Sequence, residues 1–411
     1  MVEKRRTSKL TRLYVFVIVL AMLSSFFPKQ VFAMGDNAKV DVTVNSSGMI
    51  VYGGVTPTGL QTNGLAFAFN NQSVRLTGVH MLLWPDASTR YKQEYFSWLK
   101  GWGINTIMVD FGWNFLEPAK GNYSQDYLAL MDNIVAEAKT DGIYVIFRMC
   151  QWGYPKAYQA DFPPWPDSWI LGFPTWIGQT PNFWENYDDC WSSYVAMWTM
   201  LARHYANEPY VASFDLFAEP GTDIGPGIYD PAGTVWAIWG SATCSKVTSV
   251  LFNTNKLYEK TINAIHDLSN KPIIIEGFMG TYFKNVGDTN ISLLKPNSQN
   301  FAIGFSVYDW WEFKWLDTEI LSVAQAWNVP CMVTEFGVYV NKIVAPSYDE
   351  VAWVEQACQN FSIRGMSWFY WAFGPGPDGG YNLVKDGTDD ISPILSVSLP
   401  KYSTGLLPDQ R

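Results

Sequence analysis

Residues 216–221 read LFAEPG and residues 333–337 read VTEFG. Each segment places one glutamate, Glu219 or Glu335, after a run of apolar, β-branched or aromatic residues, as at the end of a buried parallel strand. The carboxyl ends of such strands lie on one rim of a barrel. We therefore expect the two side chains to meet there, where a carboxyl pair can supply one acid and one nucleophile.

Six further runs share this pattern, and longer helical stretches separate them. The eight predicted strands are Leu76–Leu83, Thr106–Phe111, Tyr144–Met149, Ala212–Phe217, Pro272–Glu276, Ala302–Tyr308, Cys331–Glu335 and Met366–Tyr370. Between residues 76 and 370 this gives about 37 residues per strand, against roughly 31 in a typical barrel. The sequence therefore predicts the α/β class and a (β/α)8 TIM barrel with moderate insertions, the largest at 151–186.

The first 33 residues have the pattern of a signal peptide: a basic head, an apolar run over 14–27 and the cleavage signal VFA at 31–33. That run has about 14 residues, whereas a membrane-spanning helix needs roughly 20. We expect a cleaved peptide and a secreted, extracellular protein in preference to a membrane-anchored one. Residues 34–75 resemble a short N-terminal β lead-in, and 76–411 form the predicted catalytic barrel with a C-terminal extension.

Composition argues against several classes of partner and cofactor. The formal net charge is −10, and an acidic surface repels the phosphates of nucleic acids. Five cysteines in an exported chain permit at most two disulfides. The three histidines are far apart, and no HExxH motif or phosphate-binding loop occurs. We expect no nucleic-acid partner, no metal and no organic cofactor, and nothing in the sequence implies an obligatory protein partner.

Seven fragments, in this order, resemble the family 5 glycoside hydrolases of the retaining clan A, which include cellulases and mannanases. They are QSVRLTGVHM, GWGINTIMVDFGWNFLEPAKGNYS, GIYVIF, LFAEPG, KPIIIEG, VPCMVTEFG and GMSWFYWAF. The resemblance implies that Glu219 is the acid/base and Glu335 the nucleophile of a double displacement. It further implies cleavage of β-glycosidic bonds in an oligo- or polysaccharide, with endo action on a β-glucan or β-mannan. Retention needs carboxyls about 5–5.5 Å apart, and like charges that close resist ionising together.

Four positions depart from the family's pattern. Where the family usually carries Asn, Arg, His and His around the cleaved sugar, this chain has Ala218, Met108, Cys150 and Ser306. By contrast, Tyr308 and Trp371 match the family's tyrosine beside the nucleophile and its aromatic platform on the eighth strand. Without a replacement, the loss of polar contacts to the sugar would leave a slow enzyme.

Arg148 is the leading candidate for that replacement. Because strand side chains alternate, Arg148 shares the face of Cys150, which aligns with an inward-pointing family residue, and could hold Glu335 ionised. The alternative is that Arg148 binds a buried carboxylate, since Asp110 and Asp215 face inward by the same parity.

Aromatic residues make up 16% of the chain, and flat rings beside a cleft can hold sugar faces. We expect Trp84, Trp113, Trp152 and Tyr308 to contact the sugar, with Trp371 as the floor of its subsite. Core packing explains the first three equally well. We expect His80 to be a structural histidine, and the Pro- and Trp-rich insertion at 151–186 to form a wall of the cleft.

Two other functions fit the same sequence. The segments FRMCQWGYP, GFPTW and WSSYVAMWTMLARHYANEPYV also resemble the endoglycoceramidase-type subgroup, which implies a substrate with an apolar aglycone. The four departures would alternatively suit a catalytically impaired barrel that only binds carbohydrate.

Overall fold

The computed structural model describes residues 41–44, 50–53, 59–69, 72–86, 91–150, 172–177, 183, 189–220, 241–277, 285–286, 289–290, 293–308, 313–374, 380–385 and 388–403. The predicted signal peptide lies outside these residues. The chain divides into two compact units, 1–56 and 57–411. The first unit contains an antiparallel pair, β1 (Asp41–Val44) and β2 (Ile50–Gly53). The expected lead-in, 34–75, therefore contributes to both units.

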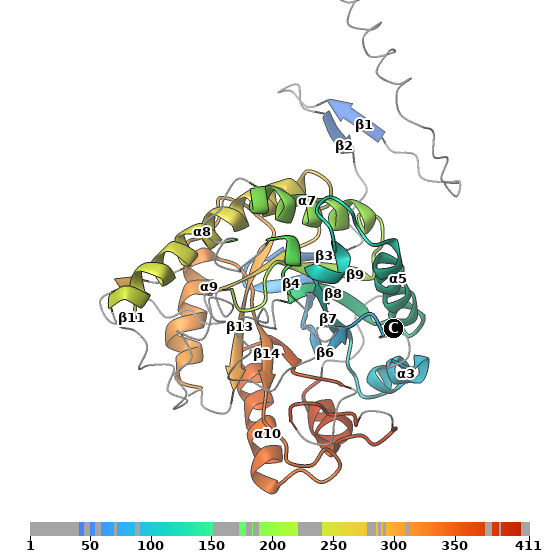
Figure 1. Ribbon diagram of the computed structural model, residues 1–411. Coiled ribbons are helices and arrows are strands. Elements are labelled where there is room, and N and C mark those ends of the chain that lie inside the picture. Colours follow the sequence, from blue (N-terminus) through green and yellow to red (C-terminus); the bar gives the residue numbers. More distant parts are fainter. Residues whose placement is uncertain are drawn as a thin grey trace, which may run out of the picture. The chain divides into compact units, whose positions relative to one another are not determined.

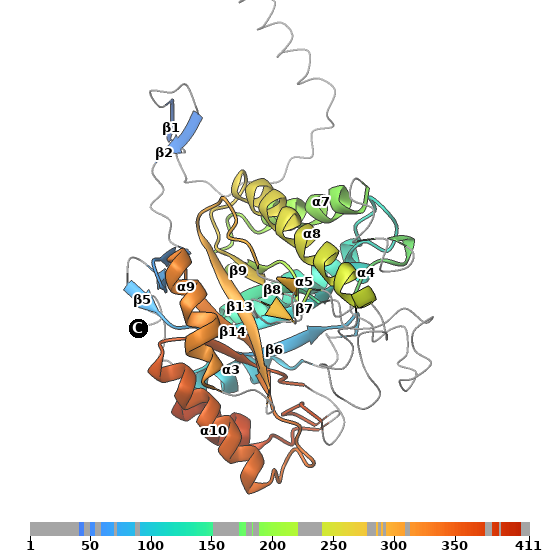
Figure 2. The same cartoon turned by 90° about the vertical axis from the view of Figure 1, so that its left-hand side faces the viewer.

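The second unit is built on a closed barrel of eight parallel strands, in the spatial order β10-β13-β14-β15-β6-β7-β8-β9 (Figures 1 and 2). The strands are β6 (Thr77–Leu83), β7 (Thr106–Gly112), β8 (Tyr144–Cys150), β9 (Val211–Asp215), β10 (Ile273–Glu276), β13 (Phe301–Tyr308), β14 (Cys331–Gly337) and β15 (Ser367–Tyr370). The predicted TIM barrel is confirmed, and all eight predicted strands are present within two residues at each end. The fourth strand ends at Asp215, two residues before the expected Phe217.

Helices follow the strands and surround them (Figure 1). Those with eight or more residues are α3 (Gln93–Gly101), α5 (Gln125–Thr140), α7 (Asp189–His204), α8 (Ser241–His266) and α10 (Tyr348–Ile363), and shorter ones include α4 (Trp113–Leu116) and α9 (Ser322–Trp327). The start of α10 is fixed by a capping box, in which Ser347 and Glu350 each bond to the other's main-chain N–H. Among the described residues, no helix combines the length and apolarity needed to cross a membrane.

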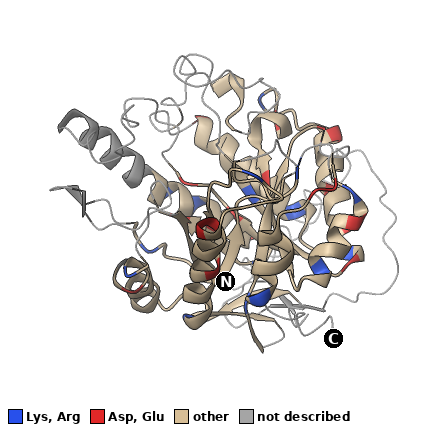
Figure 3. Ribbon diagram, turned by 90° about the horizontal axis from the view of Figure 1, so that it is seen from below, with Lys and Arg blue, Asp and Glu red and all other residues tan. Residues whose placement is uncertain are grey.

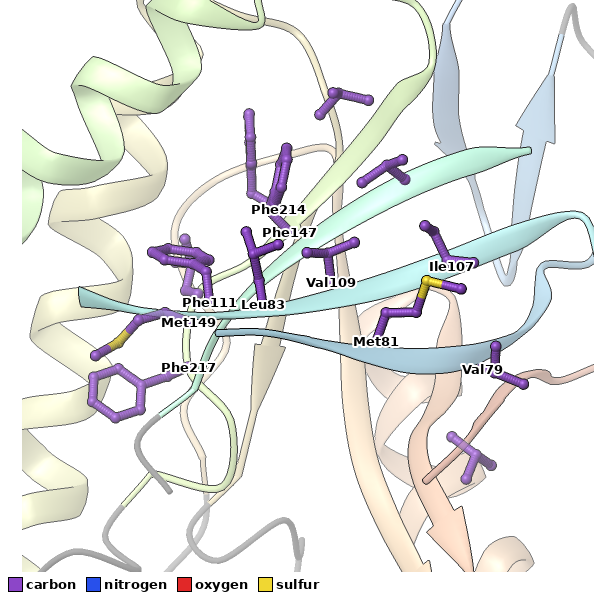
Figure 4. Close-up of a cluster of buried hydrophobic side chains, with 14 of the residues drawn as sticks. Val79, Met81, Leu83, Ile107, Val109, Phe111, Phe147, Met149, Phe214 and Phe217 are labelled. Atoms are coloured by element: carbon purple, nitrogen blue, oxygen red, sulfur yellow. The ribbon is translucent and has the colours of Figure 1, made fainter. Parts of the chain in front are cut away.

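Alternate residues of the strands pack outward against the helices. Figure 4 shows part of this layer, with Val79, Met81 and Leu83 of β6 beside residues of β7, β8 and the β9 region. Charged residues, by contrast, are interspersed over the helices and loops of the described chain (Figure 3). This outer layer is the main hydrophobic core of the barrel and fixes which residues of each strand face inward.

The inward residues form two layers of different chemistry. The lower layer is apolar and includes Met108, Ile146, Ala212, Ile274, Ala302, Met332 and Phe369. An antiparallel sheet, β3 (Leu60–Asn63), β4 (Ala66–Phe69) and β5 (Gln72–Val74), adds Leu60, Phe67 and Phe69 to the same cluster. On several strands, the next inward-facing residue lies two positions after the apolar one, and it is polar. The polar layer therefore lies toward the carboxyl-terminal rim, above an apolar base.

Met108 lies in the lower, apolar layer. It was aligned with a polar residue of the family, but at the height of the rim the residue of β7 that pairs across from Arg148 is Asp110. The polar group that β7 contributes to the site is therefore Asp110, and Met108 is a core residue.

A glycine marks the tightest approach in the barrel wall. A Cβ atom on Gly78 would lie 2.2 Å from the Thr106 carbonyl oxygen and 2.6 Å from the Phe369 ring. Gly78→Ala should lower the free energy of unfolding by about 1–3 kcal/mol, because the added methyl overpacks the barrel. Urea denaturation measures this. Gly101→Ala is the control, since its Cβ would meet nothing within 4 Å. Equal stability of the two variants would contradict the packing described.

Candidate active site

Glu219 and Glu335 come to the same rim from strands that are three positions apart in the barrel, β9 and β14. Glu335 lies within β14, whereas Glu219 is four residues beyond the end of β9 and so belongs to a loop, not to the end of the strand. Glu219 has a φ of +43°, in the left-handed region. Its N–H donates to Oε2 of Glu276 at 2.8 Å, and the N–H of Ala218 donates to the Met149 carbonyl at 3.0 Å. These bonds hold a backbone conformation that non-glycine residues rarely adopt.

The surroundings of Glu219 favour its protonated form. Burial, the charge of Glu335 and the charge of Glu276 raise the pKa of Glu219 to about 8, against smaller opposing effects of Ser306 and Arg148. Ser306 occupies a position where the family usually has histidine. In this chain, Ser306 lowers the pKa of Glu219 slightly. Glu219 therefore carries a proton at neutral pH, as a general acid requires.

Glu335 accepts hydrogen bonds from two donors, one on each oxygen. Nη1 of Arg148 donates to Oε2 at 2.7 Å, and the hydroxyl of Tyr308 donates to Oε1. Burial, followed by the charges of Glu335 and Glu219, raises the pKa of Tyr308 well above its ordinary value, so the phenol keeps its proton and remains a donor. Hydrogen bonds to the charged form of a carboxylate favour that form.

Arg148 joins four carboxyl groups in the polar layer. Besides Glu335, its guanidinium lies 3.0 Å from Glu276, 3.3 Å from Asp110 and 3.5 Å from Asp215. Both interpretations of Arg148 drawn from the sequence are thus realised: it contacts Glu335, and it is also bound by Asp110 and Asp215. Facing inward by strand parity was sufficient to place all three side chains.

Glu276 is the site residue that sequence reasoning missed. Oε1 accepts from Nη2 of Arg148 and Oε2 accepts from the N–H of Glu219, so one carboxylate links the two sides of the rim. The available signal was the apolar run Ile273–Ile275, which ends in a glutamate as the other two segments do. Burial, followed by the charge of Glu276, raises the pKa of Asp215 well above its ordinary value.

Comparison with known proteins decides the family. Residues 67–376 match the model of the cellulase family, glycosyl hydrolase family 5. The chain belongs to glycosyl hydrolase family 5. It is therefore a glycoside hydrolase of this family.

Several relatives and solved structures are similar to this family 5 chain. A curated endoglycoceramidase from Cyanea nozakii is 24% identical over 169 residues, which cover 32% of this chain and 34% of the relative. The chain thus matches about a third of that relative's length. Endo-glycoceramidase II from Rhodococcus sp., in complex with a cellobiose-like isofagomine, has a TM-score of 0.61 at 17% identity, covering 83% of this chain and 81% of that one.

Two further structures share the fold. An endogalactoceramidase has a TM-score of 0.60 at 16% identity and covers 77% of this chain and 75% of its own. A β-glucanase from Saccharophagus degradans has a TM-score of 0.55 at 18% identity, with coverage of 90% and 96%. At such low identities these likenesses establish the fold of the family 5 enzyme and no finer property.

An aromatic cluster around Trp371 packs against His80 in the family 5 chain. The Trp371 ring lies 5.0 Å from the His80 ring, centroid to centroid, and packs with Trp84 and Cys150. Trp84 is 9% exposed, so it lies at the edge of this cluster with little free surface. Cys150, which replaces a polar family residue, is buried within it. The structure therefore brings Tyr308, Trp371 and Trp84 to the region of the site.

The expectation that Trp113 contacts sugar is wrong. Trp113 is fully buried, and its indole N–H donates to Glu117 at 2.7 Å. As the first residue of α4, it packs among Phe173, Trp176, Phe183 and Tyr194, which makes it a core residue. Trp152 lies outside the described residues, as does most of the insertion at 151–186. The described part of that insertion, 172–177 and Phe183, contributes to this packing.

His80 is a structural histidine, as expected. Its Nδ1 lies 2.5 Å from Asp110 and its Nε2 lies 2.6 Å from the carbonyl of Thr334, and the side chain is fully buried. Cys190, Cys331 and Cys358 are buried free thiols, and Cys150 is also buried.

Replacing Arg148 tests its position in the family 5 site. Arg148→Met should lower the free energy of unfolding by about 3–5 kcal/mol, because buried carboxyls lose their cation. It should also lower kcat/KM at least tenfold, because Glu335 loses the donor that orients it. Denaturation and hydrolysis of an aryl β-glycoside measure the two effects.

Arg364→Met is the matched control, since Arg364 pairs with the exposed Asp317 at the surface. This change should cost about 1 kcal/mol or less and leave the rate unchanged. Lower stability with an unchanged rate in Arg148→Met would show that Arg148 is structural only.

Proposed function

We propose that this chain is an exported, retaining β-glycosidase in which Glu335 is the nucleophile and Glu219 the acid/base. The observation that carries the proposal is the difference between the two carboxyls: Glu219 has a pKa of about 8, while Glu335 is bound by Arg148 and Tyr308. One carboxyl that keeps its proton and a second that is oriented by two donors, at one rim, match the requirement of a double displacement.

In the first step, an oxygen of Glu335 attacks the anomeric carbon and the bond from that carbon to the leaving oxygen breaks. The proton of Glu219 passes to the leaving oxygen, and a glycosyl-enzyme ester forms on Glu335. In the second step, Glu219 takes a proton from water, whose oxygen attacks the anomeric carbon and releases Glu335 as a carboxylate. Glu219 therefore supplies the proton of the first step, and water supplies the proton of the second.

The same electrostatics support the change of role in Glu219. The charge of Glu335 is one of the causes that raise the pKa of Glu219. When Glu335 becomes an ester, that charge is lost, so the pKa of Glu219 falls and its ionised form becomes more populated. Glu219 is thereby an acid before the first step and a base during the second.

A row of tyrosines supports a substrate longer than one sugar. The ring of Tyr308 lies 5.5 Å from that of Tyr381, which lies 5.8 Å from that of Tyr339. The row runs from Glu335 outward to Tyr339, which is 56% exposed. The two ring pairs meet edge to face, at 74° and 89°, so the row is an aromatic surface that continues beyond the first sugar. We propose that a longer chain lies along it, in endo action on a β-glucan or β-mannan.

The second candidate is a substrate with an apolar aglycone, as in a glycolipid. It is supported by the similarity to endoglycoceramidases and by the apolar cluster of Leu82, Trp84 and Cys150 beside Trp371. Product analysis over β-glucans, β-mannans, xylans and glycolipids separates the candidates. Internal cleavage of a polysaccharide supports the first, release of an intact oligosaccharide from a glycolipid supports the second, and no cleavage of any β-glycoside contradicts both.

Export is a separate part of the proposal. It is supported by the basic head, apolar run and cleavage signal of 1–33. N-terminal sequencing of protein recovered from the culture medium should begin at residue 34, and full-length protein retained in the cell would contradict it.

The two roles predict different responses to the leaving group. With a dinitrophenyl β-glycoside, whose leaving group needs no protonation, Glu219→Gln should keep a rapid first step and then accumulate glycosyl-enzyme. Glu335→Gln should lose the first step with every substrate. Stopped-flow release of dinitrophenol measures both. Glu355→Gln, at an exposed surface pair with Lys401, is the control and should behave as wild type. A burst in Glu335→Gln would contradict the assignment.

The raised pKa of Glu219 sets the alkaline limit of activity. Because the acid must be protonated, kcat/KM should fall as the pH rises through about 8. Glu276→Gln removes a charge that raises this pKa, so the limb should move to lower pH. Asp215→Asn should leave the limb in place, because the charges that raise the pKa of Glu219 are those of Glu335 and Glu276. Profiles that coincide in wild type and Glu276→Gln would contradict the electrostatic account.

A further inference from the structure

The strand that carries Glu335 contains a bulge. Along β14, Val333 pairs with Phe305 of β13 and Glu335 pairs with the next residue, Ser306, so Thr334 is the additional residue. A bulge interrupts the alternation of side chains. Val333 and Phe336 face the outer core, so both residues between them turn inward. Without the bulge, one of those two residues would face the helices.

The neighbouring strand makes room for the bulged residue. A Cβ atom on Gly304 of β13 would lie 2.3 Å from the methyl carbon of Thr334 and 3.0 Å from Ile274 of the apolar layer. The Thr334 hydroxyl donates to the Phe305 carbonyl at 3.2 Å. The side chain of Thr334 therefore occupies the barrel interior directly beneath Glu335.

His80 contacts this bulge from a strand that is not adjacent to β14. It lies on β6, which is separated from β14 by β15, and its Nε2 is 2.6 Å from the Thr334 carbonyl oxygen. Because a carbonyl oxygen can only accept, Nε2 carries the proton and donates. The ring is oriented from its other side by Asp110 at 2.5 Å.

Asp110 connects this contact to the one made by the guanidinium. Its Oδ2 faces His80 and its Oδ1 faces Nη1 of Arg148, which also donates to Glu335. One carboxylate therefore orients two donors: one fixes the main chain just before Glu335, and the other fixes its side chain.

We propose that His80 is a positioning residue for the nucleophile, acting through its Nε2–H bond to the carbonyl of the bulged Thr334. The inference rests on the proposed role of Glu335 and extends it. His80 does not touch the reacting atoms. It holds the main chain that aims Glu335 at the anomeric carbon, and a displacement of about 1 Å at such a position can cost roughly a hundredfold in rate.

Two substitutions separate the effects of the two contacts of His80, one with Thr334 and one with Asp110. The longer amide of His80→Gln can place a donor where Nε2 lies, and so retain the bond to Thr334. The shorter amide of His80→Asn can reach toward Asp110 but not to Thr334. His80→Asn should lower kcat for the first step by about tenfold to a hundredfold, with KM nearly unchanged. His80→Gln should stay within about threefold of wild type.

The measurements are single-turnover rates with a dinitrophenyl β-glycoside, together with Tm for each variant. His204→Asn is the control, because that histidine is partly exposed at the end of α7 and bonds to Asp132. A wild-type rate in His80→Asn, or a large loss in a folded His80→Gln, would overturn the inference. Should His80→Asn fail to fold, His80→Gln still decides. Activity in Glu335→Gln would instead overturn the proposed function.

Discussion

The guanidinium of Arg148 is the interaction on which the site depends. Among the described residues it is the only buried arginine or lysine side chain, and four carboxyls surround it. Four carboxyls share this one guanidinium in a medium of low polarity, which favours the protonated form of the acids that it binds least. The geometry decides which. Glu335 receives the shortest bond from the guanidinium, whereas Asp215 has the longest contact and a raised pKa.

The charges around Arg148 distinguish the two catalytic candidates, Glu219 and Glu335. Burial and the charges of Glu335 and Glu276 raise the pKa of Glu219, and the opposing effect of Arg148 is smaller. Glu276 also binds the main chain of Glu219, which means that the group that tunes the acid is the group that places it. In this chain the arginine beside Glu335 comes from the third strand of the barrel, β8, whereas family members usually carry an arginine on the second. Departures at the other polar positions accompany that arrangement.

Strand periodicity made much of this predictable. Apolar runs separated by longer helical stretches located the eight strands, and parity placed Arg148, Asp110 and Asp215 inside the barrel. Other features depend on tertiary neighbours. The role of Glu276 follows from the position of β10 beside β9. The inward turn of Glu335 follows from a bulge, because strict alternation of side chains would have turned Glu335 outward. Trp113 was misassigned because an aromatic residue after a strand can pack against helices as readily as it can face a cleft.

The most direct test of the central claim is to identify the carboxyl that becomes the ester. A 2-deoxy-2-fluoro-β-cellobiosyl fluoride forms a glycosyl-enzyme that hydrolyses slowly, and peptide mass spectrometry locates the modified residue. We predict one label, on Glu335, because that side chain is oriented by Arg148 and Tyr308 and lies at the rim. A label on Glu276 or Glu219 would contradict it, since the charge balance around Arg148 assigns those carboxyls to positioning and to proton transfer.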